Sequence, residues 1–432
     1  MRKNDIKPQT IPAQLDRGTH ADYLGRFSVE SVCDLLGMST AYISRIFPST
    51  RTLSAQEVVR LLDDDAFVET FIPRSKILPY LIAKAADPAP EAEPALVAAT
   101  VSNLLLGDTH QLIRQLKPKS IQCVVTSPPY WGMRLYEVSW PIAWADGENC
   151  AYGMEQTPEG YIRHTVELLH YLKPAMREDA SVWWNVMDTF NTRTQIRTNA
   201  SEALQAMQGK ESRSWADYEA RRYSAGHAYL KDGEQCMIPF KIAERASRIG
   251  YHVKSIISWN KSSSMPEPQN SRVSRNIEYI LHLSPKRTPK FFKEAYKTLP
   301  EALGGRNKKT EPDKLADFWN LPTSAGRDGH GAQFALSLPG RCIGLSTEPG
   351  DAVLDIFVGA GTSAVASKLL GRRFIGFDIS QTYLDIAQQR LDIAQQRLNA
   401  TQHSLDLVAA VEELTSLPEP LVPEEYVQGS FL

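Results

Sequence analysis

The stretch Ala352-Val-Leu-Asp-Ile-Phe-Val-Gly-Ala-Gly-Thr-Ser363 passes from an apolar run into a loop that contains two glycines. The apolar run at 352–356 predicts a buried strand, and the segment after the loop, up to residue 370, predicts a helix. A second apolar run, Phe374-Ile-Gly-Phe-Asp378, follows directly. A strand, a helix and another strand in this order predict one unit of a parallel sheet.

The loop inside this unit has the composition of a ligand-binding turn. Gly359 and Gly361 let backbone N–H groups approach a ligand closely, with the N-terminus of a helix behind them. Asp378 ends the next strand, where a carboxylate can accept both hydroxyls of a ribose. Position 364 is Ala, which this glycine pattern tolerates. The spacing indicates an adenosine-containing ligand and does not choose between NAD and S-adenosylmethionine.

The same alternation extends back along the chain. Apolar runs at 104–106, 121–125, 181–186, 253–259 and 278–283 alternate with helical patterns, notably at 161–172 and 238–249. This order predicts an α/β fold in which a doubly wound, mostly parallel sheet is covered by helices on both faces. Ligands bind such sheets at the carboxyl ends of the strands. The repeated heptads at 384–390 and 391–397 predict one amphipathic helix.

A second loop follows the strand at 121–125 and reads Ser127-Pro128-Pro129-Tyr130. Two successive prolines fix their φ angles and supply no N–H, so carbonyl oxygens remain free to accept hydrogen bonds. Rigid acceptors at Ser127 and Pro128 suit an exocyclic amine, and Tyr130 offers a flat face on which an extracted base can stack. A turn that merely ends the strand is the alternative interpretation.

These two loops resemble those of the beta-class DNA amino-methyltransferases, in which the catalytic half precedes the S-adenosylmethionine half (a circularly permuted motif order). The likeness covers roughly residues 100–400. Further landmarks agree: Leu106-Gly-Asp108, Trp184-Asn-Val-Met-Asp188, Trp259-Asn-Lys261, Met265-Pro-Glu-Pro268, Phe318-Trp-Asn-Leu-Pro322 and His330-Gly-Ala-Gln-Phe334. The resemblance implies a Rossmann-like methyltransferase sheet with a target-recognition insertion.

The family's site residues carry over position by position. The catalytic set is Ser127, Pro128, Pro129 and Tyr130. The cofactor-binding set is Asp108, Asp355, Phe357, Gly359, Gly361, Thr362 and Asp378, with a weaker supporting element at His330 and Phe334. The chain departs from the family where Ile356 replaces a usual proline and Ala360 a usual serine. Neither change removes a glycine, so we expect cofactor binding to persist.

A basic stretch occupies the family's target-recognition slot. Residues 286–309 hold eight lysines or arginines against two glutamates, interleaved with aromatic residues. Such a segment can bind a nucleic-acid backbone, whereas an ordinary solvated surface is the alternative. The predicted DNA-binding residues are Lys286, Arg287, Lys290, Lys293, Arg306, Lys308 and Lys309.

The reaction implied by the resemblance is methyl transfer from S-adenosylmethionine to the exocyclic amine of a flipped base in double-stranded DNA. In this family a serine at the first position of the tetrapeptide favours cytosine N4, with adenine N6 as the alternative. No Pro-Cys dipeptide is present, which argues against methylation of cytosine carbon 5. The reaction needs no metal. Protection of DNA in a restriction–modification or phage–host setting follows, and the sequence decides neither a partner restriction endonuclease nor a homodimer.

Residues 1–95 lie outside that resemblance, and the first 85 of them have short helical patterns. Short helical patterns on either side of Gly37 have the outline of a helix-turn-helix and resemble the excisionase-like family. Ser39, Thr40, Tyr42 and Arg45 would then face DNA. A helical bundle used for packing or dimerisation has the same outline. The predicted organisation is a helical module (1–85), a Pro/Ala/Glu linker (86–98), a catalytic half (99–285) with a lid-like excursion at 189–233, a target-recognition region (286–325), a cofactor half (326–400) and a tail (401–432).

Composition excludes other classes. The 432 residues are 42% hydrophobic and 23% charged, as in globular proteins, and the net charge of -2 requires any DNA-binding surface to be local. Five scattered cysteines without a CxxC pair predict neither a disulfide framework nor a zinc site. No signal-peptide pattern or 20-residue apolar run occurs, so we expect a cytoplasmic protein that does not contact membranes. A nicotinamide oxidoreductase leaves the 127–130 loop unexplained, and both intact loops argue against a non-catalytic DNA-binding regulator.

Overall fold

The computed structural model describes residues 27–29, 32–33, 40–48, 52–54, 57–58, 61, 77, 102–133, 140–192, 194–195, 221–222, 230–261, 270–323 and 334–401. The chain forms two compact units, Met1–Glu93 and Pro94–Leu432, and their boundary falls inside the segment read as a linker. The linker itself, Ser39, His330 and residues 402–432 lie outside the described residues.

The first unit is not purely helical. Strand β1 (Phe27–Ser28) pairs antiparallel with β2 (Thr52–Leu53), and helix α2 (Thr40–Ile46) lies between them in the chain. The prediction of helices alone was therefore wrong, because strands of two residues carry no readable periodicity. Within α2, Ile43 is buried, whereas Thr40 and Arg45 are exposed.

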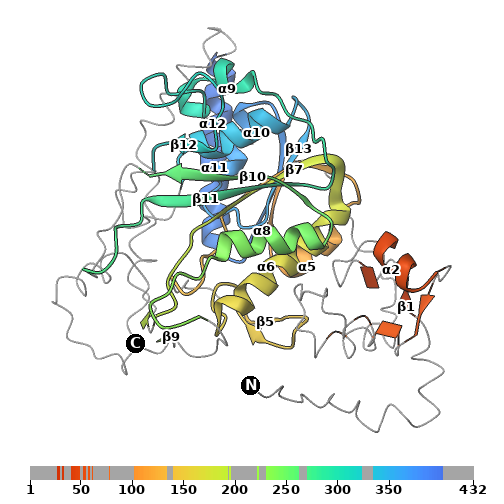
Figure 1. Cartoon of the computed structure of the whole chain (residues 1–432). Helices are drawn as coiled ribbons and strands as arrows, with labels where there is room; N and C mark the ends of the chain where they lie inside the picture. Colours follow the sequence, from red (N-terminus) through yellow and green to blue (C-terminus); the bar gives the residue numbers. More distant parts are fainter. Residues whose placement is uncertain are drawn as a thin grey trace. The chain divides into compact units, whose positions relative to one another are not determined.

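The second unit is built on an eight-stranded sheet in the order β12-β10-β11-β7-β4-β13-β14-β3 (Figure 1). Its strands are β3 (Asn103–Leu106), β4 (Ile121–Thr126), β7 (Met176–Val186), β10 (His252–Asn260), β11 (Ile277–Ser284), β12 (Phe318–Asn320), β13 (Ala352–Asp355) and β14 (Arg373–Asp378). All neighbouring pairs are parallel except those of β11, which runs antiparallel to both β10 and β7. The sheet confirms the predicted doubly wound, mostly parallel fold.

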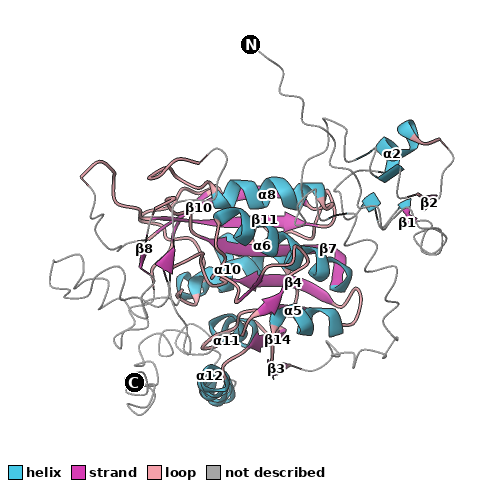
Figure 2. Cartoon of the chain, turned by 90° about the horizontal axis from the view of Figure 1, so that it is seen from below, coloured by secondary structure: helices cyan, strands magenta, loops and turns pink. Residues whose placement is uncertain are grey.

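Helices cover both faces of this sheet. Helices α6 (Pro158–Leu172) and α8 (Ile238–Arg248) lie on one face, and α10 (Ser337–Ser346) and α11 (Thr362–Leu369) lie on the other (Figures 1 and 2). Helix α12 (Gln381–Thr401) packs on α11 and spans both heptad copies, as predicted. No helix in the described part of the chain is both long and apolar enough to cross a membrane.

Shorter elements complete the unit. They are helices α5 (Thr109–Leu112) and α9 (Ala295–Thr298), the 3-10 turns Ile113–Gln115, Lys173–Ala175 and Glu301–Leu303, and the antiparallel strand pairs β5 (Ile142–Ala143) with β6 (Asn149–Cys150) and β8 (Thr194–Gln195) with β9 (Arg221–Arg222). The last pair lies within the segment predicted as a lid-like excursion.

The complete burial of the central strands explains why they could be predicted from the sequence. Every residue of β4 and β13 is buried, because both faces of these strands lie under helices. A side chain such as Trp183 in β7 packs between the sheet and α10, where its indole N–H donates to Ser346 Oγ at 3.1 Å.

Candidate active site

The two sequence loops meet where the winding of the sheet reverses. From β4 the chain continues through α6 to β7 on one side, and from β13 it continues through α11 to β14 on the other side. β4 and β13 are parallel neighbours, with Val353 opposite Cys123. Just beyond this pairing, Thr126 Oγ1 donates a hydrogen bond of 2.7 Å to Asp355 Oδ1. This junction is the position where doubly wound sheets bind ligands.

Asp355 organises the start of the glycine loop. Its Oδ1 also accepts a hydrogen bond from Phe357 N at 3.0 Å, and its Oδ2 accepts one from Ser363 Oγ in α11. Burial raises the pKa of Asp355 to about 6, although the hydrogen bonds from Ser363 and Thr126 oppose this rise. The carboxyl therefore ties the strand, the loop and the helix together.

The glycine loop itself depends on backbone conformations that favour glycine. Gly359 and Gly361 have φ angles of 49° and 82°. A Cβ at Gly361 would lie 2.7 Å from Ala387 Cβ, so α12 packs directly against this residue. From α12, Arg390 Nη1 donates to Ala360 O at 2.8 Å and to Thr362 Oγ1 at 3.2 Å. Sequence reasoning missed Arg390, because it lies in the heptad repeat rather than in a motif.

The two aspartates predicted to bind the cofactor, Asp378 and Asp108, lie at the ends of neighbouring strands. Asp378 ends β14, and its Oδ2 accepts a hydrogen bond from Gly359 N at 2.9 Å. β3 is the adjacent strand, and Gly107 N donates to Asp378 O at 2.9 Å. Asp108 follows and caps α5 by accepting from His110 N. Burial raises the pKa of both carboxyls.

The tetrapeptide is held by its prolines and by α6. Pro128 is buried, and the Tyr161 hydroxyl donates to Pro129 O at 3.0 Å. Within the residues that the structure describes, no hydrogen bond reaches the carbonyl oxygens of Ser127 and Pro128. Two acceptors therefore remain available on a loop that cannot easily move.

Tyr130 is the centre of a polar network that joins three further strands. Its hydroxyl donates to Glu278 Oε2 in β11 at 2.5 Å. Asn185 Nδ2, in β7, lies 2.7 Å from Tyr130 Oη and 3.2 Å from Ser127 Oγ. Lys261 Nζ, just after β10, donates to Glu278 Oε1 at 2.8 Å. The landmark sequences contained Asn185 and Lys261, but only the sheet order shows that they meet Tyr130.

Aromatic side chains pack against residues of both loops. The ring of Tyr152 stacks on Phe357 with centroids 5.3 Å apart and contacts Tyr161 at 5.0 Å. The Tyr152 hydroxyl shares a hydrogen bond of 2.7 Å with Thr165 in α6. Phe357 thus connects the glycine loop to the same helix that holds Pro129. Phe334 pairs with Thr323 in an isolated bridge and packs against the main hydrophobic core.

The structure does not bring most predicted DNA-binding residues to this edge. Because β11 runs antiparallel, residues after Ser284 leave the sheet at the opposite edge. Lys290 is paired there with Glu348 (2.6 Å) and Asp351 (3.1 Å). Arg306 is paired with Asp313. Lys286, Arg287, Lys293, Lys308 and Lys309 are exposed.

Lys308 and Lys309 differ from the other cations in their position. The neighbouring Thr310 O accepts a hydrogen bond from Asn320 Nδ2 at 3.1 Å, and Asn320 ends β12. Asn320 in turn bonds Asn260, the last residue of β10. Both strands end at the same edge as β4, so these two lysines lie near the carboxyl edge of the sheet.

The chain is similar to known DNA methyltransferases. The family model described as DNA methylase (N6/N4) matches residues 121–389. Type II methyltransferase M.Cfr9I of Citrobacter freundii is 30% identical over 283 residues, covering 66% of this chain and 85% of the relative. M.XycI of Xanthomonas campestris pv. cyanopsidis is 29% identical over 285 residues, with the same coverages. The PvuII DNA methyltransferase (cytosine-N4-specific) superposes with a TM-score of 0.46 at 16% identity, over 74% of this chain and 95% of that one. Since the family model matches more than half of the chain, this protein belongs to the N6/N4 DNA methylase family, the DNA amino-methyltransferases.

Proposed function

We propose that the protein transfers a methyl group from S-adenosylmethionine to the exocyclic N4 amine of a cytosine flipped out of double-stranded DNA. The observation that carries this proposal is the hydrogen bond from Thr126 to Asp355, which joins the tetrapeptide loop to the glycine loop at the reversal point of the sheet. Family membership supports the reaction class. Methylation of adenine N6 by the same residues is the alternative.

The glycine-loop residues fit the proposed methyl donor. A Cβ placed on Gly359 would meet no atom within 4 Å, so the space beside the loop is open. Asp378, whose Oδ2 accepts from Gly359 N, is the expected partner of the ribose hydroxyls. Asp108 is expected toward the adenine, and Phe357, Gly361 and Thr362 along the methionine end. When bound, the sulfonium supplies a methyl group that the amine nitrogen takes, with release of a thioether and one proton.

The tetrapeptide then acts on the amine. An aromatic amine is a poor nucleophile because its lone pair is delocalised into the ring. The Pro128 carbonyl and the Ser127 hydroxyl can accept its two hydrogens, which favours a pyramidal nitrogen with an available lone pair. Asn185 Nδ2 donates toward Ser127 Oγ and so keeps the oxygen's lone pairs oriented. Positioning and fixed dipoles therefore supply the acceleration.

The choice of base rests on Ser127. A hydroxyl at the first position of the tetrapeptide is the family feature associated with cytosine, and the proposal follows it. Mass analysis of nucleosides from DNA treated with the protein tests the choice directly. We expect N4-methylcytosine. Detection of N6-methyladenine would instead identify adenine as the target base, and the proposed roles of the two loops would stay the same.

Matched variants test the two loops separately. We expect Ser127→Ala to abolish methyl transfer and to leave the affinity for S-adenosylmethionine unchanged, whereas Asp378→Ala should weaken that affinity. Ser120→Ala, directly before the other end of β4, is the control and should transfer methyl groups normally. Normal turnover by Ser127→Ala would overturn the proposed role of the tetrapeptide.

The biological setting is proposed from the relatives. Two of them carry the name Type II methyltransferase, which supports a role in restriction–modification. DNA methylated by this protein should then resist one sequence-specific endonuclease and remain sensitive to others.

A further inference from the structure

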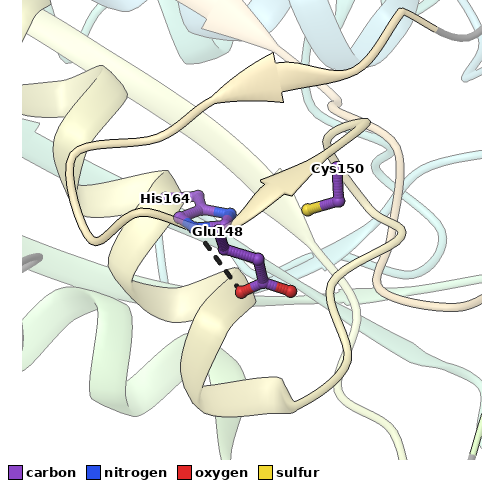
Figure 3. A group of neighbouring side chains, drawn as sticks. All are labelled: Glu148, Cys150 and His164. Atoms are coloured by element: carbon purple, nitrogen blue, oxygen red, sulfur yellow. Dashed lines mark ion pairs between the residues drawn. The ribbon is translucent and has the colours of Figure 1, made fainter.

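Three potential metal ligands converge beside α6, away from the polar network of Tyr130. Glu148 and Cys150 lie on the β5–β6 hairpin, and His164 lies on α6 (Figure 3). One ligand atom from each residue lies within 4.8 Å of the other two. His164 Nε2 is 3.8 Å from Glu148 Oε2, and the His164 side chain is completely buried. We propose that Glu148, Cys150 and His164 bind a structural Zn²⁺ ion.

The donor set suits zinc in its chemistry, and the pair of His164 and Glu148 suits it in size. Zinc prefers thiolate, imidazole and carboxylate ligands at about 2.0–2.3 Å, which places tetrahedral ligand atoms roughly 3.3–3.8 Å apart. The separation of 3.8 Å between His164 Nε2 and Glu148 Oε2 lies at the upper end of that range. The Cys150 thiolate and the Glu148 carboxylate together neutralise the two charges of the ion. A water molecule can take the fourth position.

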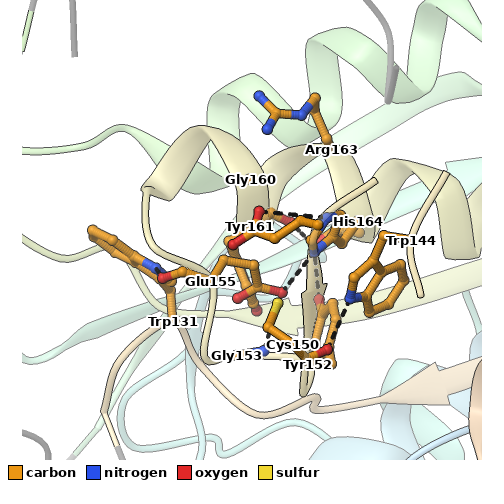
Figure 4. A network of polar contacts seen from close by, with 12 residues as sticks. Trp131, Trp144, Cys150, Tyr152, Gly153, Glu155, Gly160, Tyr161, Arg163 and His164 are labelled. Atoms are coloured by element: carbon orange, nitrogen blue, oxygen red, sulfur yellow. Dashed lines mark hydrogen bonds and ion pairs between the residues drawn. The ribbon is translucent and has the colours of Figure 1, made fainter. Parts of the chain in front are cut away.

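A surrounding shell orients the imidazole for this purpose. Glu155 Oε1 accepts from His164 Nδ1 at 3.1 Å, the arrangement that commonly fixes a zinc-bound histidine and leaves Nε2 toward the metal. The indole of Trp144 stacks on the imidazole with centroids 4.1 Å apart (Figure 4). Gly160 makes room for the carboxylate, since a Cβ there would lie 2.8 Å from Glu148 Oε2.

The charges of the cluster also favour a cation. Among the residues that the structure describes, the cationic partners of Asp146, Glu148 and Glu155 are Arg163 and His164. Glu155 is buried, and its Oε2 has no hydrogen-bond partner among the residues that the structure describes. Without an ion, Asp146 Oδ1 accepts from His164 Nε2 at 3.3 Å. Zn²⁺ would displace the proton on His164 Nε2 and the thiol proton of Cys150, and would form one bond to each of the three ligands. No oxidation or reduction takes place.

The ion would stabilise the segment after β6, in which Tyr152 and Gly153 contact residues at both active-site loops. Tyr152 follows Cys150 by two residues and stacks on Phe357. Gly153 O accepts from Gly132 N, two residues after the tetrapeptide, at 2.7 Å. The proposed site takes no part in methyl transfer and does not rest on the proposed function.

Metal content and spectroscopy of the full chain test the proposal. After treatment with EDTA, the protein is dialysed against Zn²⁺ or Co²⁺, and bound metal is measured by mass spectrometry. We expect one ion per chain, a thiolate-to-Co²⁺ absorption band in the near ultraviolet, and a higher melting temperature with Zn²⁺ than with EDTA. Cys150→Ser should abolish the band, and Glu148→Gln should weaken binding by more than about tenfold.

Matched variants distinguish the proposed site from adventitious metal binding elsewhere on the protein. Cys236→Ala removes another buried cysteine and Glu178→Gln removes an exposed acid, and both should retain the ion and the band. Circular dichroism confirms that each variant is folded, and Glu148→Gln serves if Cys150→Ser is not. Failure to bind stoichiometric metal, or equal binding by Cys150→Ser and the wild type, would overturn the proposal. Methyl transfer is measured separately, so its absence would bear only on the proposed function.

Discussion

Thr126 and Asp355 are 229 positions apart in sequence, yet Thr126 Oγ1 donates to Asp355 Oδ1 at 2.7 Å. This bond joins the end of the strand that leads to the tetrapeptide with the end of the strand that leads to the glycine loop. The two loops therefore share one support at the reversal point of the sheet.

Loss of that bond should cost stability. Thr126→Val keeps the shape of the side chain but removes one of the donors to a buried carboxylate. We expect the free energy of unfolding, measured with urea, to fall by about 1–3 kcal/mol. Thr298→Val, which loses an exposed hydroxyl that donates to Glu294 O, is the control and should change little. An unchanged midpoint for Thr126→Val would show that the bond contributes nothing.

The raised pKa of Asp355 predicts a defined pH dependence. Burial raises this pKa from 3.8 to about 6, so the native state holds the proton more tightly than the unfolded chain does. Its contribution to stability is complete below the unfolded pKa and is lost as the pH rises through about 6.

The test compares wild type with Asp355→Asn, which cannot ionise. We expect the free energy of unfolding of wild type to fall relative to that of the variant between about pH 4 and pH 6, and the difference to level off above. Asp232→Asn, at an exposed position, is the control. A difference between wild type and Asp355→Asn that does not vary with pH would contradict the assignment.

The hydroxyl and the ring of Tyr130 should have separable effects. Tyr130→Phe keeps the ring but leaves Glu278 and Asn185 without their shared partner, so we expect turnover to fall by roughly tenfold while methylation remains measurable. Tyr130→Ala also removes the surface on which a base can stack, and turnover should disappear. Single-turnover methylation assays measure both effects. Equal rates for the two variants would mean that the ring has no role beyond its hydroxyl.

Substitutions of exposed and of ion-paired lysines in the basic segment 286–309 should affect DNA binding differently. Lys308→Ala and Lys309→Ala remove charges near the carboxyl edge, and each should lower the salt dependence of DNA affinity by about one unit of log K against log salt. Lys290 is paired with Glu348 and Asp351, so Lys290→Ala should leave that slope unchanged. Binding measured from low to moderate salt decides this. A reduced slope for Lys290→Ala alone would place DNA at the opposite edge.

A buried ion pair attaches this basic segment to α10. Arg341, completely buried, pairs with both carboxylate oxygens of Glu311 and donates to the carbonyls of Gly304 and Gly305. Arg341→Met leaves a buried carboxylate without its partner and should lower the free energy of unfolding by about 3–5 kcal/mol. The double variant Arg341→Met, Glu311→Leu should lose clearly less in the same urea experiment. An equal loss would point to packing rather than charge.

The sequence by itself predicted the central strands, the helices α6, α8, α11 and α12, and the two loops that follow β4 and β13. These features are local: fully apolar runs such as 121–125 reveal burial, and prolines or glycines at set positions restrict the backbone whatever surrounds them. The placement of both loops at the carboxyl edge of the sheet followed from the rule that ligands bind parallel sheets at the carboxyl ends of strands. The pairing of β4 with β13, which lets Thr126 bond Asp355, came only from the structure.

Only the tertiary structure decided which distant side chains meet. Glu278 reaches Tyr130 because β11 lies beside β7, and the same reversed strand sends Lys290 to the far edge. The contact of Arg390, in α12, with the glycine loop depends equally on packing, as does the approach of Cys150 to His164. Such meetings are set by strand order, direction and register across the whole sheet, and no local spacing of residues encodes them.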